Sequence, residues 1–474
     1  MTTLLARNAD VLVTMDGERR ELRNAGLYTE DGIIKQVGPT AELPGTADTI
    51  VDLSGQICLP GFVNTHHHLN QTLTRNFPGA QNNNLFPWLK VLYRVWARTD
   101  AEASRVSTLV GLAELALSGC TTVFDHSYVF KNGNNVDCQV EAARELGVRF
   151  HASRGSMSLG ESKGGLPPDD CVEDEAVILK DSQRAIEKYH DASVGSMTQI
   201  ALAPCSPFTV TASLLKESAA MARHYKVRLH THLCETLDEE RYTLERFRLR
   251  PVDWMETLGW VGDDVWFAHA VHVDDDEIGK FAATGCGVAH CPCSNMRLAS
   301  GIAPIKKYIA AGVKVGLGVD GSSSNDSSNI LLEARQAMLL ARLRLGLLPP
   351  EGPRKYMFLS PSHPVRASEW MTAREALELA TVGGARVLGR TDIGALDVGK
   401  CADFFSLDLN TIGYAGALLD PVAAVVFCAP QQARTTVING KVVVKDGEIV
   451  TMDMRPVVAT HNRCAARMAE EAAR

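Results

Sequence analysis

The sequence predicts an α/β protein, a (β/α)8 TIM barrel joined to a small β-sandwich built from both ends of the chain. In the middle of the chain, short apolar runs alternate with helical patterns, which is typical of a parallel sheet. Eight such runs, each followed by a helical stretch, favour a closed barrel over an open sheet. The runs cover residues 60–66, 121–126, 148–154, 198–205, 227–234, 265–271, 286–291 and 314–320.

Both ends of the chain are rich in β patterns instead. Short β segments separated by turns occupy residues 10–58, where Asp31-Gly32 predicts a tight hairpin. Similar strand and hairpin patterns return after residue 402. We therefore predict three parts: a composite β-sandwich from residues 1–59 and 395–455, a catalytic barrel over residues 60–394, and a C-terminal helix over residues 456–474.

Composition narrows the class of function. The net charge of −8 at pH 7, without a basic block, argues against nucleic-acid and anionic-membrane partners. No apolar stretch approaches the roughly 18 residues that cross a bilayer, and the N-terminus lacks a signal-peptide pattern. The 12 cysteines are scattered rather than spaced as a disulfide framework. We expect a cytoplasmic protein with reduced thiols. An acidic chain can bind a neutral or cationic small molecule, and the net charge does not decide this.

Three histidines follow the first apolar run of the barrel. Alternate residues of a strand share a face and lie about 6.6 Å apart, so His66 and His68 can converge on one ion while His67 points away. Neutral imidazole is a common zinc ligand. A His-x-His pair alone is explained equally well as a polar strand end, so the remaining ligands must come from elsewhere in the chain.

Further candidates end later runs, on the barrel face where such enzymes carry their chemistry. His232 is a better ligand than His230, because Glu235 then lies within reach of water on the ion; His230 is favoured as a packed or supporting residue. Asp320 ends an apolar strand between glycines, where a buried carboxylate needs a cation or hydrogen-bond donors. His269 ends the sixth run. The other runs also end in polar residues, namely Asp125, His126, Arg154 and His290.

Three loops are candidates for function. Residues 69–99 carry several aromatic residues, and residues 155–172 are rich in Gly, Ser and Pro, as in a mobile lid. Residues 346–370 contain several prolines, and we expect an interface or a surface connection there. A capping box at residues 372–375 then opens a helix.

Together these motifs resemble the amidohydrolase superfamily, specifically its mononuclear metal-dependent deaminase branch. The resemblance rests on the His-rich run, His232-x-x-Glu235, Ala268-His269 and Gly-Val-Asp320-Gly, and it extends over nearly the whole chain. It implies one divalent ion, with zinc as the expected metal and iron as the alternative. It also implies Glu235 as the proton shuttle and His269 as a non-ligand partner of the nucleophile. The implied metal ligands are His66, His68, His232 and Asp320, and the implied catalytic residues are Glu235, His269 and Asp320.

Within that branch, the segments around Gln71, Arg154 and Asn325 resemble the 8-oxoguanine deaminases and, next to them, the s-triazine hydrolases. The implied reaction is hydrolysis of a cyclic amidine C–N bond, converting 8-oxoguanine to urate and ammonia, with isocytosine as a further substrate. In relatives, a Gln after His-x-His and an Arg at the third strand end often hold the heterocycle. This implies Gln71, Arg154 and Glu235 as substrate contacts, with a structural salt bridge as the alternative role for Arg154.

Other functions stay open at this point. They are an s-triazine amino- or chlorohydrolase, a pterin deaminase and a non-catalytic amidohydrolase-like scaffold. Glu235 favours deamination, because ammonia needs a proton to depart and chloride does not. A different fold is used by the zinc nucleobase deaminases that carry His-x-Glu and Pro-Cys-x-x-Cys motifs. That fold is excluded, because the chain has no His-x-Glu and Pro292-Cys293 is not followed by the second cysteine of the motif. The resemblance also implies a homodimer or a larger homo-oligomer.

Overall fold

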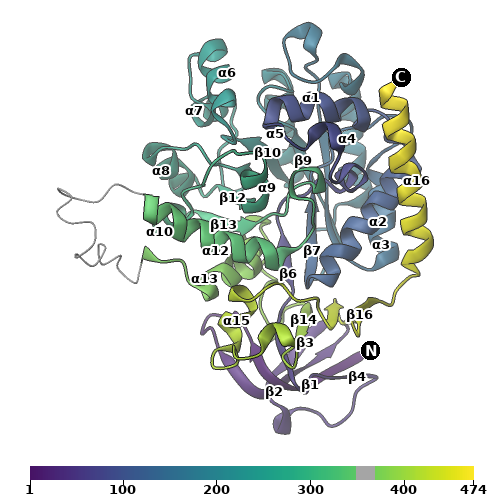
Figure 1. Ribbon diagram of the computed structural model, residues 1–474, viewed down its shortest axis with the longest axis vertical. Helices are drawn as coiled ribbons and strands as arrows, with labels where there is room; N and C mark the ends of the chain where they lie inside the picture. The colour runs from purple at the N-terminus through teal and green to yellow at the C-terminus, as the bar shows by residue number, and fades with distance from the viewer. Residues whose placement is uncertain (348–368) are drawn as a thin grey trace, which may run out of the picture.

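The computed structural model describes residues 1–347 and 369–474. The proline-rich connection predicted over residues 346–370 falls almost entirely outside these described residues. The barrel with its helices forms the upper part of the molecule in Figure 1, and a β-sheet layer lies below it. The N-terminus lies in the sheet layer, whereas the C-terminal helix runs along the side of the barrel.

Eight parallel strands close into a barrel in chain order, with the last strand pairing with the first through Leu317 and Asn64. This confirms the predicted (β/α)8 barrel, and every strand overlaps its predicted apolar run. The strands β7, β8 and β11 are buried along their whole length, as expected for a parallel sheet that is covered on both faces. They are β6 (Phe62–Asn64), β7 (Cys120–Asp125), β8 (Arg149–Ser156), β9 (Thr198–Pro204), β10 (Arg228–Leu233), β11 (Val265–His269), β12 (Gly287–His290) and β13 (Lys314–Leu317).

Helices follow the barrel strands and cover the outside of the barrel (Figure 1). α5 begins at Ala212, because the Thr211 side chain accepts a hydrogen bond from the Leu214 backbone N–H and caps the first turn. The helices are α1 (Leu85–Trp96), α2 (Ala101–Leu117), α3 (Val136–Leu146), α4 (Glu175–Tyr189), α5 (Ala212–Tyr225), α6 (Leu237–Phe247), α7 (Pro251–Thr257), α8 (Asp275–Thr284), α9 (Pro292–Arg297), α10 (Ile305–Ala311), α11 (Ser322–Asn325), α12 (Ile330–Leu347), α13 (Ala373–Glu378), α14 (Gly384–Val387), α15 (Pro421–Phe427) and α16 (Met454–Ala473).

Both chain ends contribute to the sheet layer, which confirms the expected small β domain. Its strands are hydrogen-bonded into one connected sheet with the order β17-β16-β15-β14-β5-β1-β2-β3, and β4 pairs with β1. The two chain ends meet where β5 pairs antiparallel with β14. The strands are β1 (Thr3–Val13), β2 (Glu21–Glu30), β3 (Ile33–Pro39), β4 (Thr49–Asp52), β5 (Gln56–Pro60), β14 (Phe404–Asp408), β15 (Thr435–Ile438), β16 (Lys441–Lys445) and β17 (Glu448–Ile449).

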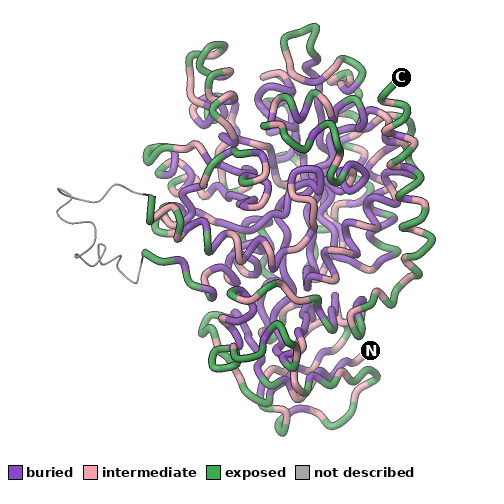
Figure 2. The backbone as a smooth tube through the Cα atoms, in the orientation of Figure 1, coloured by how far each residue is buried: buried purple, intermediate pink, exposed green. Residues whose placement is uncertain are grey.

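A buried ion pair joins the barrel to the sheet. The Arg149 guanidinium, at the start of β8, donates two hydrogen bonds to the Asp403 carboxylate, at 3.0 and 3.1 Å, and both side chains are 1% exposed. Removing either partner would leave a buried charge unpaired, at a typical cost of about 3–5 kcal/mol. Buried residues run through the middle of both parts, and exposed residues lie at the periphery (Figure 2).

Smaller predictions were also correct. Thr372 and Glu375 form the predicted capping box at α13, with hydrogen bonds of 2.7 and 3.1 Å. All 12 cysteines are free thiols. Of the helices in the described part of the chain, none is long and apolar enough to cross a membrane.

Candidate active site

Five of the predicted site residues meet at the carboxyl end of the barrel. His66 and His68 directly follow β6, His232 lies in β10, His269 ends β11 and Asp320 follows β13. His232 is partly exposed, and the other four side chains are buried. Parallel strands end at the same rim of a barrel, so residues that lie 254 positions apart in the sequence become neighbours.

His68 and His232 face each other with their Nε2 atoms 3.1 Å apart. The Nδ1 atom of His68 lies 2.6 Å from the carbonyl oxygen of His126, and Nδ1 of His232 lies 2.6 Å from that of Cys205. A carbonyl oxygen only accepts hydrogen bonds, so each Nδ1 carries the hydrogen and each neutral ring presents an Nε2 lone pair. Two lone pairs at this distance repel each other, and a cation between them would remove the repulsion.

His66 is oriented in the same way through His230. The Nδ1–H of His230 donates to the carbonyl oxygen of Trp266 at 3.0 Å, so its Nε2 accepts from the Nδ1–H of His66 at 2.8 Å. Nε2 of His66 is then buried without a hydrogen-bond partner among the residues that the structure describes. His230 therefore orients His66, which is the supporting role favoured from the sequence.

Asp320 completes the cluster. Its Oδ1 lies 3.3 Å from Nε2 of His66 and 3.2 Å from Nε2 of His68, while its Oδ2 accepts hydrogen bonds from Ser294 at 2.6 Å and Ser324 at 3.2 Å. Three imidazole nitrogens and one carboxylate suit zinc or ferrous iron. The donor atoms thus fit a divalent ion. Two overlapping groups of four residues could each hold an ion, because the donor atoms within each group lie within 4.8 Å of one another. The groups are His66, His232, His269 and Asp320, and His66, His68, His126 and His232.

His126 is a donor that the sequence reasoning left out of the metal cluster. Its ring stacks on His232, with centroids 4.7 Å apart and an interplanar angle of 25°. Nε2 lies 2.8 Å from the carbonyl oxygen of Ala203, whereas Nδ1 is buried and lacks a partner within the described ranges. His126 therefore lies against the proposed ligands rather than in solvent.

The backbone turns sharply where three strands end. Cys234, His269 and Asp320 have φ of +55°, +71° and +60°, in the left-handed region that residues other than glycine rarely adopt. Each such residue costs about 1–3 kcal/mol, and such conformations concentrate at functional sites where the surroundings hold them. These turns direct the strand-end side chains into the cluster.

Glu235 lies beside the cluster, as predicted. Its Oε2 is 3.5 Å from Nε2 of His269, and its Oε1 accepts a hydrogen bond from the Ser300 hydroxyl at 3.2 Å. Burial raises the pKa of Glu235 above its usual value. His269 is fixed from its other side, where Nδ1 lies 2.9 Å from Oδ1 of Asn295. A buried carboxyl that keeps its proton to higher pH, next to a fixed imidazole, is suited to proton transfer.

Glu239, four residues after Glu235, was missed from the sequence. It is buried in the first turn of α6, where its carboxylate oxygens accept hydrogen bonds from the backbone N–H groups of Cys234 at 2.8 Å and Glu235 at 3.4 Å. It also lines the cavity described below. A second acidic residue one helical turn after His-x-x-Glu is the signal that would have identified it. Glu239 holds the turn that presents Glu235.

We expect Glu239→Gln to lower kcat about tenfold without loss of metal. The amide retains one acceptor oxygen, so one of the two backbone hydrogen bonds is lost and Glu235 is held less firmly; a loss of about 1.4 kcal/mol corresponds to tenfold. Steady-state kinetics with metal analysis tests this, with Glu245→Gln on the exposed face of the same helix as the control. An unchanged kcat would show that Glu239 does not position Glu235.

A narrow cavity opens onto the cluster. Its polar wall contains His68, Glu235, Glu239, His269 and Asp320. The rest of its lining is mainly aromatic and aliphatic, which suits a flat ring. These residues come from residues 69–99 and from segments after β7, β9 and α9, and they include Leu85, Trp88, Leu89, Tyr93, Tyr128, Phe208 and Leu298.

Gln71 reaches this cavity, as expected from the sequence. It lies in a short 3-10 helix directly after the histidines and is 1% exposed. A Cβ atom at position 321 would overlap the Gln71 amide, so the glycine there leaves room for the Gln71 side chain. Oε1 of Gln71 is buried and has no hydrogen-bond partner within the described part of the chain.

Arg154 does not reach the cavity. Its guanidinium donates to Asp181 at 2.6 Å and to both carboxylate oxygens of Glu173 at 3.0 and 3.2 Å, and it lies 4.3 Å from the centroid of the Phe130 ring. Its side chain is 1% exposed, and it is not among the residues that line the cavity. The structural salt bridge considered as the alternative is therefore what the structure contains, because two acids take up the guanidinium.

The loop over residues 155–172 contributes no lining residue to this cavity. It contains two short 3-10 helices, and the backbone N–H groups of Ser158 and Leu159 both donate to the Thr209 carbonyl oxygen at 3.0 Å.

The strand-end Asp125 has a supporting role, accepting hydrogen bonds from the Leu69 N–H at 2.6 Å and from Gln139 at 2.7 Å.

A buried glutamate supports the Asp320 side of the site. Glu333, in α12, accepts hydrogen bonds from the Cys293 N–H at 3.1 Å and from the Asn325 amide at 2.7 Å, and Asn325 also donates to the Val319 carbonyl oxygen. Burial raises the pKa of Glu333 from 4.5 to about 8.

We expect Glu333→Gln to flatten the pH dependence of stability between about pH 5 and 8. In this window the folded protein holds a proton that the unfolded chain has lost, so Glu333 makes the unfolding free energy fall as pH rises, by up to about 1.4 kcal/mol per pH unit. Glutamine does not titrate. Denaturant titrations at pH 6 and pH 8 test this, and an equal drop in variant and wild type would refute it.

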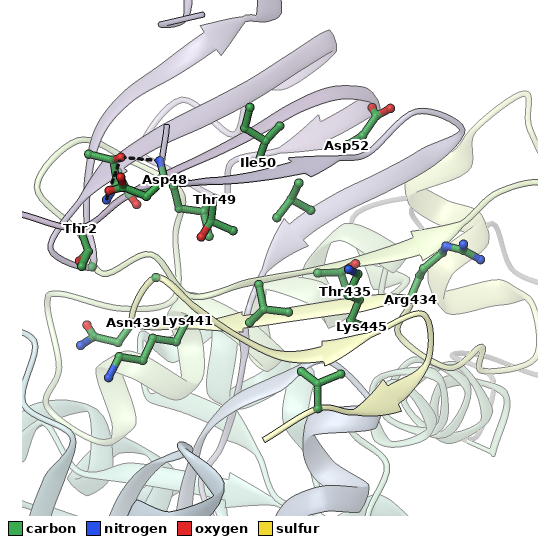
Figure 3. A pocket seen from close by; sticks show the side chains of 18 of the residues that line it. Thr2, Asp48, Thr49, Ile50, Asp52, Arg434, Thr435, Asn439, Lys441 and Lys445 are labelled. Atoms are coloured by element: carbon green, nitrogen blue, oxygen red, sulfur yellow. Dashed lines mark hydrogen bonds between the residues drawn. The ribbon is translucent and has the colours of Figure 1, made fainter. Parts of the chain in front are cut away.

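A second, wider hollow of about 820 Å³ lies in the sheet layer. Figure 3 shows it between the segment carrying Asp48, Ile50 and Asp52 and the segment carrying Lys441 and Lys445. No histidine lines it, and its acidic and basic side chains belong to solvated strand edges. The predicted residues His68, Gln71, His232, Glu235, His269 and Asp320 therefore line the cavity at the barrel mouth and not this hollow.

Comparison with known proteins finds relatives that match nearly the whole chain. The chain is 46% identical over 446 residues to an 8-oxoguanine deaminase from Pseudomonas aeruginosa, with 94% of both chains covered. It is 40% identical over 471 residues to a hydroxydechloroatrazine ethylaminohydrolase from Pseudomonas sp. (strain ADP), covering 96% of this chain and 93% of that protein.

The structure of an atrazine chlorohydrolase from Arthrobacter aurescens TC1, complexed with zinc, matches with a TM-score of 0.88 and 32% identity, covering 98% of this chain and 100% of that one. Residues 57–443 match the sequence model of the amidohydrolase family. These matches confirm the resemblance seen in the motifs: the chain belongs to the amidohydrolase family.

Proposed function

We propose that the protein is a metal-dependent hydrolytic deaminase that converts 8-oxoguanine to urate and ammonia, with isocytosine as a further substrate. One observation carries the proposal. Three imidazole Nε2 atoms and Asp320 converge beside a buried acid, Glu235, at the end of a cavity with aromatic walls. The 46% identity to an 8-oxoguanine deaminase selects the substrate.

His66, His68, His232 and Asp320 would hold one divalent ion. Zinc is the expected metal, because the site offers nitrogen and carboxylate donors and the atrazine chlorohydrolase matched above is complexed with zinc; iron is the alternative. When bound, the ion acts as a Lewis acid and makes water nucleophilic near neutral pH. The Nδ1 hydrogen bonds of the three imidazoles keep their Nε2 atoms turned toward it.

The protein's own residues move the protons. Glu235 donates its proton to the ring nitrogen next to the carbon that carries the amino group. The resulting carboxylate takes the proton of the hydroxyl that has added to this carbon and delivers it to the departing ammonia as the carbonyl forms. Asp320 and His269 accept or orient the proton of the attacking water. His269 can do so because Asn295 fixes its ring, with Nε2 3.8 Å from Oδ2 of Asp320.

The cavity walls favour a planar heterocycle. Trp88 and Phe208 offer flat faces, and Leu89 and Leu298 exclude water. Gln71 presents an amide oxygen that is free to accept a ring N–H. We do not assign Arg154 a substrate contact, because its guanidinium is paired with acids outside the cavity.

An s-triazine amino- or chlorohydrolase is the second candidate, favoured by the 40% identity to hydroxydechloroatrazine ethylaminohydrolase. A pterin would also fit a flat cavity. A non-catalytic scaffold is the least favoured, because the complete donor set and Glu235 are present together. Buried proton-transfer groups have no use in a scaffold.

The test is ammonia release from a panel of 2-aminopurines, isocytosine, 2-aminopterins and aminotriazines by the zinc-loaded and iron-loaded protein. The expected result is highest kcat/KM for 8-oxoguanine. Turnover of triazines without turnover of oxopurines would replace the proposed substrate, and a metal-loaded protein without any turnover would favour the scaffold.

We further propose a homodimer or larger homo-oligomer in the cytoplasm. Exposed leucines follow one another on the outside of α12, where Leu339, Leu343 and Leu347 are 37%, 53% and 68% exposed. Free thiols persist in a reducing compartment. Size-exclusion chromatography with light scattering measures the mass of the particle in solution. A value near 51.4 kDa, the mass of one chain, would contradict the oligomer.

A further inference from the structure

Two polar atoms in the cavity wall lack hydrogen-bond partners. They are the hydroxyl of Tyr93 and Oε1 of Gln71, both buried, and neither has a partner among the residues described. Buried polar atoms are almost always paired, and leaving one unpaired costs free energy. An unpaired hydroxyl and an unpaired amide oxygen in one cavity point to a ligand that pairs with both.

Tyr93 belongs to the cavity wall, and its buried hydroxyl has no partner among the described residues. The residue lies in α1, and its ring packs edge-on against Trp96 with centroids 5.7 Å apart. Burial raises the pKa of the hydroxyl well above its usual value, and Cys205, Tyr128, Cys171 and Glu235 raise it further. Cys205, Tyr128 and Glu235 line the same cavity as Tyr93.

The two free groups have opposite character. A neutral tyrosine hydroxyl beside acidic groups donates its hydrogen, so it seeks a carbonyl or another acceptor. The Gln71 Oε1 atom only accepts, so it seeks an N–H. A ring lactam, –NH–C(=O)–, presents both in one plane, and oxopurines, isocytosine and pterins carry this unit. An aminated ring without a carbonyl would leave the Tyr93 hydroxyl unpaired.

We infer that Tyr93 is a specificity-determining residue, whose hydroxyl donates a hydrogen bond to a ring carbonyl of the substrate while Gln71 accepts from a ring N–H. This inference rests on the proposed function and narrows it to lactam heterocycles. The site then rejects rings without that carbonyl, because binding them would bury an unpaired hydroxyl.

The test is Tyr93→Phe with three substrates: 8-oxoguanine, guanine, which lacks the 8-carbonyl, and 2-amino-8-oxopurine, which lacks the 6-carbonyl. We expect kcat/KM for 8-oxoguanine to fall about 10- to 100-fold, mainly through KM. For the analogue that lacks the carbonyl bound by Tyr93, the variant and wild type should agree within about twofold. An equal fall for all three substrates, or no fall for 8-oxoguanine, overturns the inference.

Tyr242→Phe is the matched control. It removes another buried hydroxyl, at a tyrosine that does not line the cavity. We expect this variant to behave as wild type with all three substrates. A loss with the same substrate pattern as Tyr93→Phe would mean that the effect is not a contact at the cavity wall, which overturns the inference.

Binding separates this inference from the proposed function. In a Glu235→Gln background, calorimetry gives the Kd of 8-oxoguanine with and without Tyr93→Phe, and we expect a ratio of about 10 or more. If the wild type does not deaminate any substrate, the proposed function fails, while this ratio still tests Tyr93. A ratio near 1, or no binding by either protein, overturns the inference.

Discussion

Replacing Glu235 by Gln is expected to lower kcat for ammonia release about 10²- to 10⁴-fold while the metal content stays that of the wild type. A positioned acid/base contributes this range of rate. The amide has the shape of the acid and retains an oxygen for the Ser300 hydroxyl, which now donates to Oε1 at 3.2 Å. What the variant loses is the proton that Glu235 transfers.

The same substitution also changes the pH profile. Burial raises the pKa of Glu235, so the wild type keeps the acid form to higher pH than an exposed glutamate would, and its kcat should fall as pH rises through that pKa. The residual kcat of Glu235→Gln should not show this fall with rising pH. Normal kcat would remove Glu235 from the mechanism, and loss of metal would make it a ligand instead. Glu245→Gln, which is exposed on α6, is the control.

The barrel was predictable because its strands are buried on both faces. A parallel strand such as β11 reads as a continuous apolar run whose polar residue, His269, marks its carboxyl end. The sequence alone therefore predicted that His66, His68 and the acid after β13 lie on one rim of the barrel. The β domain was predictable only as strands from both chain ends, since pairing such as β5 with β14 depends on contacts between residues some 350 positions apart.

The groups that support the site were harder to predict. Ser294, Asn295 and Ser300 lie in or just after α9, yet they hold Asp320, His269 and Glu235 respectively. Their roles come from how one loop folds over the barrel mouth, which leaves no periodic pattern in the sequence. Arg154 shows the converse error. Its place at a strand end indicated function, but Asp181 and Glu173 pair with it in the fold.

Tyr93 lies between these two cases. A functional loop was predicted over residues 69–99 from its aromatic residues, whereas the structure has the helix α1 there. Nothing in the sequence separates Tyr93 from Trp96, against which its ring packs. The distinction appears only when hydrogen bonds are assigned. The indole N–H of Trp96 donates to Thr74 at 2.9 Å, whereas the hydroxyl of Tyr93 has no partner in the described residues.

Removal of the ion is expected to abolish turnover and to lower the melting temperature. Without a cation, the Nε2 lone pairs of His68 and His232 face each other at 3.1 Å, and that of His66 is buried alone. An ion present at 100 times its Kd stabilises the folded state by about 2.7 kcal/mol. Thermal unfolding of chelator-treated protein, before and after addition of zinc or ferrous iron, measures the shift, and calcium should give none because it prefers oxygen donors.

Variants of the ligands sharpen this prediction. His232 belongs to both sets of donors within 4.8 Å, whereas His68 belongs to one, because His269 and Asp320 complete the other set. His232→Ala should therefore lose the zinc-dependent shift entirely, and His68→Ala should retain a weaker shift. His224→Ala, at an exposed position of α5, should shift as the wild type does. A full zinc-dependent shift in His232→Ala would mean that the ion binds elsewhere, and the proposed enzyme would lose its metal centre.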